Sequence, residues 1–296
     1  MSLRLEMLQV ARLGPSVLGE EASRLIEKYI RGQQNTDGGF RDRDGASDLY
    51  YTSFAIDALT ALQVDIPVDS LTEYLEKQFD VLEDLDFVHL CCLARASSAL
   101  EKYRGKDRLQ PVLDRIEEFR TADGGYNQTP SHATGSTYAC FLAWGAYSDH
   151  GREISNQESL ATCLKTLATN DGAWSNDLDF PIANAPSTAA AVAVYRNLRL
   201  AIPENTTHWI LSCFHPGSGG FLAFPDAPMP DLLTTAVALH TLDALQTPLE
   251  NIRENCLDFI DTLWSAQGGF HGNWSDDQID IEYTYYGLLA LGHLAL

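Results

Sequence analysis

Apolar residues along the chain form two kinds of helical segment that alternate with each other. In the first kind they cover one face only, as Leu25, Ile26 and Tyr29 do, which is the pattern of a half-buried helix. In the second kind they occur nearly all round, so the helix must be covered on every side. The one-sided segments span 21–33, 68–79, 109–119, 158–167, 205–214 and 249–264. The all-round segments span 49–62, 87–100, 137–147, 187–198, 232–245 and 281–294.

A glycine motif stands between the two segments of most pairs. It begins at Asp37, Asp123, Asp171, Ser218 and Gln267, at intervals of 86, 48, 47 and 49 residues. The first interval is close to two periods, so a repeat near residue 80 has lost its glycines and the chain contains six repeats. Five of the all-round segments follow a residue that favours a helix N-cap: Asp48, Asp86, Asn184, Asp231 and Asp280.

These repeats predict an all-α fold, an (α/α)6 toroid of six helical hairpins. We expect the fully buried helices to form an inner ring that the half-buried helices wrap as an outer ring. The terminal repeats lack the polar caps of an open solenoid, so the ring is expected to close. The prediction places residues 1–296 in a single domain.

Charge and composition narrow the range of partners. The 296 residues include 41 acidic and 20 basic ones, which gives a formal net charge of −21. That balance repels phosphate backbones, so we expect no nucleic acid partner. No apolar run has the length of a membrane span, and the first 15 residues lack a signal-peptide pattern. We therefore expect a cytoplasmic protein that is not integral to a membrane.

The glycine turn and the helix start that follows it resemble the repeat of a known superfamily. This superfamily contains the prenyltransferase β subunits and the squalene–hopene (class II terpene) cyclases. The resemblance is carried by residues 34–40 with 48–52 and by 267–270 with 280–284, and it extends over about residues 15–296. It implies the same toroid, with a central funnel and a small hydrophobic isoprenoid ligand. Whether a helical α-type partner subunit is needed stays open.

The resemblance does not extend to the prenyltransferase zinc site. That site uses an Asp-x-Cys pair and a His on the last two inner helices. Asp231 stands at the Asp position, but Leu233 replaces the Cys and Tyr283 replaces the His. Catalytic zinc takes three protein ligands, so we expect no zinc and interpret Asp231 as a helix cap.

The residues that handle diphosphate or an alkene in the superfamily are also depleted. The cationic positions hold Pro225, Pro228, Asn184 and Gly135 or Ser136. A diphosphate would therefore need magnesium, held by the acidic loops. Of the cyclase Asp-x-Asp-Asp motif only the first position survives, at Asp231. The nearest substitutes, 177–179 and 276–280, lie in loops before inner helices and are better explained as solvated acidic loops.

The candidate site consists of side chains at the starts of the inner helices. The candidates for catalysis are Asp231, Asp280, Glu282 and Tyr283. The candidates for ligand binding are aromatic: Tyr50, Tyr51, Phe54, Phe87, Tyr138, Phe141 and Tyr286. Aromatic faces suit an isoprenoid chain and attract developing carbocations, although the same rings could instead fill the barrel axis.

Two functions follow from this site. The first is an isoprenoid-binding protein, prenyltransferase-like or terpene-cyclase-like, with an aromatic-lined funnel. The second is a non-catalytic module that binds a lipid or a protein on the same toroid. The depleted motifs favour the second function, whereas the tyrosines and acids at the predicted mouth favour the first.

Overall fold

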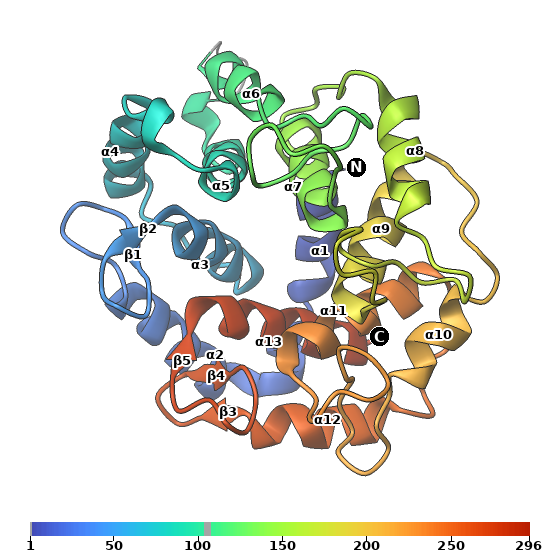
Figure 1. Ribbon diagram of the computed structural model, residues 1–296. Helices are drawn as coiled ribbons and strands as arrows, with labels where there is room; N and C mark the ends of the chain where they lie inside the picture. Colours follow the sequence, from blue (N-terminus) through green and yellow to red (C-terminus); the bar gives the residue numbers. More distant parts are fainter. Residues whose placement is uncertain (1, 104–107) are drawn as a thin grey trace.

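A computed structural model describes residues 2–103 and 108–296 and shows two concentric rings of helices (Figure 1). The inner ring consists of α3 (Leu49–Ala61), α5 (Phe87–Ser98), α7 (Thr137–Ser148), α9 (Ala185–Asn197), α11 (Leu232–Ala244) and α13 (Ile281–Leu294). The outer ring consists of α2 (Gly14–Gly32), α4 (Val68–Phe79), α6 (Leu109–Glu117), α8 (Gln157–Thr166), α10 (Thr206–Ser212) and α12 (Arg253–Thr262). The predicted toroid is confirmed, and its helices coincide with the predicted segments to within a few residues at most ends.

The inner ring is closed. Each inner helix contacts the next one, and α13 contacts α3, so the last repeat packs against the first. The inner helices are apolar all round because one face packs on the outer ring and the other faces the axis. Fully buried residues such as Leu59, Leu239 and Leu288 carry this core.

In the repeats that keep the motif, its first glycine packs against the start or body of the next repeat's outer helix. Gly38 has a φ of +96°, and a Cβ there would lie 2.0 Å from the carbonyl oxygen of Ser70 in α4. Gly268 has a φ of +95°, and its Cβ would lie 2.2 Å from the carbonyl oxygen of Leu25 in α2. Only glycine tolerates both the backbone conformation and the close approach. The contact at Gly268 fastens the sixth repeat to the first.

Short strands, which the sequence pattern does not predict, connect the helices of two repeats. β1 (Phe40–Arg41) pairs with β2 (Ser47–Asp48) in the first repeat. In the sixth, β4 (Gly269–His271) pairs with both β3 (Trp264–Ser265) and β5 (Ile279–Asp280), all antiparallel. Short 3-10 helices occur at Leu82–Asp84 and Glu101–Tyr103. The hairpins hold the loops at the N-terminal ends of α3 and α13.

Helix α1 (Leu3–Ala11) lies inside the ring, where the sequence pattern predicts no helix (Figure 1). It packs against α3, α7 and α13. Its Arg4 forms an ion pair with Asp57 of α3, with Nε 2.6 Å from Oδ1, and its Glu6 pairs with Arg196 of α9. Because Asp57 and Arg196 lie well along their helices, α1 occupies the end of the barrel where the inner helices finish.

Candidate functional site

A cavity of about 330 Å3 remains on the barrel axis, next to α1 and enclosed by the inner helices. The aromatic side chains that line it are Tyr50, Tyr138, Phe141 and Tyr286, which come from three inner helices. Leu3 and Met7 of α1 line it as well. The rest of the wall is Arg95 together with residues of α9 and α11: Pro186, Ala189, Ala190, Ala193, Leu233, Val237 and His240. A cavity therefore remains on the axis, and the end that is filled is filled by α1 rather than by these aromatic rings.

The candidate aromatic residues divide between this cavity and the protein core. Phe54 lines a smaller lobe of about 60 Å3, which shares Tyr50, Tyr138 and Tyr286 with the main cavity. Phe87 does not reach the axis, because it is fully buried and packs against Phe119 and Tyr126 at centroid distances of 5.2 and 6.3 Å. The expectation that Phe87 faces the funnel is therefore wrong, since the first residue of α5 points toward the outer ring.

Glu282 and Tyr50 form the most perturbed polar pair near the cavity. The Tyr50 hydroxyl donates a hydrogen bond to Oε1 of Glu282 at 2.6 Å. Burial raises the pKa of Glu282 to about 7, and the hydrogen bond from Tyr50 opposes this rise. The carboxyl is therefore divided between its two protonation states near neutral pH, so it can both donate and accept a proton. Tyr50 itself lines the cavity and connects Glu282 to it.

Asp280 is occupied by structural contacts. Its Oδ1 accepts the backbone N–H of Tyr283 at 2.8 Å, which caps α13, and its Oδ2 lies 2.7 Å from Arg43. Arg43 also bonds both oxygens of Asp276, at 2.7 and 3.2 Å, and its guanidinium lies 5.6 Å from the Tyr283 ring centroid. Burial raises the pKa of Asp280 in spite of Arg43.

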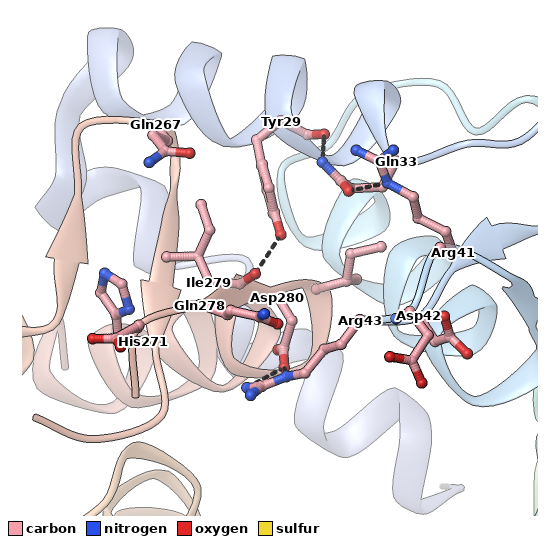
Figure 2. A pocket seen from close by; sticks show the side chains of 14 residues that line it. Tyr29, Gln33, Arg41, Asp42, Arg43, Gln267, His271, Gln278, Ile279 and Asp280 are labelled. Atoms are coloured by element: carbon pink, nitrogen blue, oxygen red, sulfur yellow. Dashed lines mark hydrogen bonds and ion pairs between the residues drawn. The ribbon is translucent and has the colours of Figure 1, made fainter. Parts of the chain in front are cut away.

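Figure 2 shows this ion pair beside a polar cleft of about 420 Å3, between the glycine loops of the first and sixth repeats. Tyr29 of α2 donates a hydrogen bond to the carbonyl oxygen of Ile279 at 3.0 Å across that cleft. The sequence pattern does not single out Arg43, because it lies in a loop and its partners are more than 230 residues away. Only the closed ring brings them together.

Asp231 caps α11. Its Oδ1 accepts the backbone N–H of Thr234 and its Oδ2 accepts the Thr234 hydroxyl, each at 2.7 Å. Burial raises the pKa of Asp231. Tyr51 lies outside the cavity lining, and its ring packs edge-on against Tyr50 at a centroid distance of 5.7 Å. Of the four polar candidates, Glu282 is the one that forms a hydrogen bond with a side chain lining the axial cavity.

Two further observations concern metals and membranes. Within residues 2–103 and 108–296, no group of three or more His, Cys, Asp or Glu side chains is placed to hold a metal ion. All six cysteines lie buried with free thiols. Among the described helices, none combines the length and apolar character needed to cross a membrane.

Sequence comparison identifies the family. The model of the prenyltransferase alpha-alpha toroid domain matches residues 20–76, 67–198 and 188–295, which together span nearly the whole chain. The chain belongs to this family. None of the curated protein sequences is similar enough to this toroid domain to count as a match.

Solved structures with the same architecture carry different activities. A protein from Actinoplanes has 14% sequence identity to the toroid domain, with 93% and 99% of the two chains covered and a TM-score of 0.63. A variant of the α-1,6-mannanase of Salegentibacter has 13% identity, 93% and 98% coverage and a TM-score of 0.63. A variant of the type II terpene cyclase MstE from Scytonema, in complex with geranylgeranyl dihydroxybenzoate, has 12% identity, 99% and 98% coverage and a TM-score of 0.61. At these identities the similarity shows the fold alone.

Proposed function

We propose that the toroid domain binds an isoprenoid with a neutral polar head group, and that the chain of this ligand occupies the axial cavity. One observation carries the proposal: an aromatic and aliphatic cavity meets a single carboxyl–phenol pair, Glu282 with Tyr50. Its volume of about 330 Å3 falls at the lower end of the roughly 300–1,000 Å3 that small-molecule pockets occupy. The MstE complex supports the idea, since that toroid binds an isoprenoid compound, geranylgeranyl dihydroxybenzoate.

Electrostatics favour a neutral head group over a diphosphate. The carboxyls of Asp231, Asp280 and Glu282 all lie at the starts of inner helices, where the head group would enter. Arg43, which lies beside Asp280, already pairs with Asp276 and Asp280, and Arg95 in the cavity wall already pairs with Asp57. A diphosphate would meet carboxyl groups there without an unpaired cation, which is unfavourable. A hydroxyl or carbonyl can instead hydrogen-bond to Glu282.

The chemistry available to Glu282 is proton transfer to or from oxygen. A carboxyl with a pKa of about 7 is matched to that task at neutral pH, whereas protonation of an alkene demands a much stronger acid. The proposed reaction class is therefore acid–base chemistry on an oxygen-bearing isoprenoid. The alternative is binding without catalysis, which the capping roles of Asp231 and Asp280 favour.

Ligand retention tests the proposal. We expect native mass spectrometry to show one farnesol or geranylgeraniol per chain, and farnesyl diphosphate to bind more weakly with or without magnesium. Ala189→Phe places a ring inside the cavity and is expected to abolish retention, whereas Ala122→Phe adds the same ring at an exposed position. Wild-type protein that retains neither alcohol, or Ala189→Phe protein that retains both, would contradict the proposal.

Glu282→Gln separates the two functional alternatives. An amide keeps the size of the side chain but cannot exchange a proton near neutral pH. If the protein is an enzyme, this variant still binds the alcohol but no longer converts it to a product of different mass or retention time. If the protein only binds, no conversion occurs in either form.

A further inference from the structure

We propose that α1 sets the depth of the axial cavity, and that its residues Leu3 and Met7 select the length of the apolar ligand. This inference rests on the proposed function, because it concerns the ligand of the same cavity. Neither residue belongs to the helical repeats on which the fold is built.

Leu3 and Met7 form the part of the lining that does not come from the inner helices. They stand one helical turn apart on α1, are 5% and 8% exposed, and line both lobes of the cavity. The wall of α9 is built from small residues, Pro186, Ala189, Ala190 and Ala193, and therefore leaves the axis open. A chain that enters beside Tyr50 and runs along this wall meets α1 at the far end.

Two ion pairs, of which only Arg4–Asp57 is buried, hold α1 across the barrel. On one side Arg4 and Arg95 both bind Asp57, at 2.6 and 2.5 Å, and Asp57 is fully buried. On the other side Glu6 pairs with Arg196 of α9, which stands opposite α3 in the ring of six inner helices. The backbone of α1 also lies directly on α13, since a Cβ at Gly292 would lie 2.1 Å from the carbonyl oxygen of Val10. The floor of the cavity is thus fixed at several points.

A fixed floor discriminates by length. A chain that fits buries all of its apolar surface, whereas a longer chain leaves its last isoprene unit outside or displaces α1. Each excluded isoprene unit should weaken binding by about tenfold or more, because burial of each methylene contributes measurably to affinity. The Leu3 and Met7 side chains decide where this cut-off falls.

Truncation of the floor tests the inference. Met7→Ala and Leu3→Ala are each compared with wild type in their affinity for geraniol, farnesol and geranylgeraniol. We expect either variant to shift the preferred alcohol toward the longer chain, with a change in the affinity ratio of about tenfold. Leu5→Ala is the matched control, because Leu5 lies on the same helix, is 49% exposed and lines neither lobe. An unchanged length preference in folded Met7→Ala and Leu3→Ala overturns the inference.

Photolabelling of the wild-type protein provides a second test that needs no core substitution. A farnesol analogue with a diazirine at the end remote from the hydroxyl should label the peptide that contains Leu3 and Met7. Labelling confined to inner-helix residues at the mouth would overturn the role of α1 while leaving the proposed function intact. Failure of the wild-type protein to bind any of the three alcohols would instead overturn both.

Discussion

At the scale of single residues, Glu282 stands out because its environment opposes its charge. Burial raises its pKa to about 7, Asp280 adds to the rise, and Tyr50 and Arg43 oppose it. The folded state therefore favours the protonated carboxyl relative to the unfolded chain, where the reference value is 4.5. The resulting contribution to the free energy of unfolding is present below pH 4.5 and is lost as the pH rises through about 7.

Tyr50→Phe is expected to raise the pKa of Glu282 further. The substitution removes the hydroxyl that donates to Oε1 and stabilises the ionised form, while the ring and its packing against Phe54 remain. The pKa is followed through the side-chain carboxyl carbon in an NMR titration. Tyr51→Phe serves as the control, because Tyr51 has no hydrogen bond to Glu282 in the structure and should leave that pKa nearly unchanged. A lower pKa in Tyr50→Phe would show that this hydrogen bond does not stabilise the charged carboxylate.

At the scale of secondary-structure elements, the glycine loop of the repeat motif is hydrogen-bonded to the inner helix that follows it. A threonine one turn into the inner helix accepts the backbone N–H of the aromatic residue that follows the two glycine positions. The pairs are Thr52 with Phe40, Thr188 with Trp174, Thr235 with Phe221 and Thr284 with Phe270, at 2.9 to 3.3 Å. In the third repeat the sulfur of Cys140 replaces the hydroxyl. The motif that reveals the family is therefore architectural.

Thr235→Val tests the hydrogen bond between the glycine loop and the inner helix. The substitution keeps the shape of the side chain but leaves the buried N–H of Phe221 without its acceptor, so we expect the free energy of unfolding to fall by about 1–3 kcal/mol. Chemical denaturation measures the loss. Thr235→Ser retains the hydroxyl and should recover most of the stability. Equal losses in Val and Ser variants would assign the effect to packing rather than to the hydrogen bond.

The sequence predicts those elements that depend on local patterns recurring in every repeat. The inner and outer helices follow from apolar spacing, and capping roles such as that of Asp231 follow from residue type and position. α1 escapes prediction because its buried Arg4 resembles a solvated terminal residue, and only the remote Asp57 makes its burial favourable. The same holds for Arg43, whose partners lie on the last repeat. Phe87 is misplaced because an all-round apolar helix does not reveal which of its faces meets the axis.

At the scale of the whole molecule, the candidate site depends on closure of the ring. Tyr50 comes from the first inner helix and Glu282 from the last, 232 residues apart in the sequence. The two meet because α13 packs against α3 and because the glycine loop of the sixth repeat docks on α2. The same seam, which is the junction between the sixth repeat and the first, brings Arg43 to Asp276 and Asp280. The candidate residues are therefore brought together only when the ring is closed.

Gly268→Ala is expected to loosen this seam selectively. An added Cβ would lie 2.2 Å from the carbonyl oxygen of Leu25, and a φ of +95° is strained for alanine. We expect a loss of about 1–3 kcal/mol in the free energy of unfolding and faster hydrogen exchange in α2 and α13 than in α7 and α9. Gly219→Ala makes the equivalent clash, 1.9 Å from the carbonyl oxygen of Asn255, but away from the seam.

Comparison of Gly268→Ala with Gly219→Ala separates the effect of opening the ring from the effect of backbone strain at a glycine. Gly219→Ala should speed exchange in α11 and α12 and leave the pKa of Glu282 near 7, because Tyr50 and Glu282 stay in contact. Gly268→Ala should change the pKa of Glu282, because α13 separates from α3. Exposure of the carboxyl to solvent lowers its pKa, whereas loss of the hydrogen bond from Tyr50 raises it. Solvent exposure removes the larger of the two influences, so the net shift is expected to be downward. An unshifted pKa in a destabilised Gly268→Ala protein would mean that the site holds together without the seam.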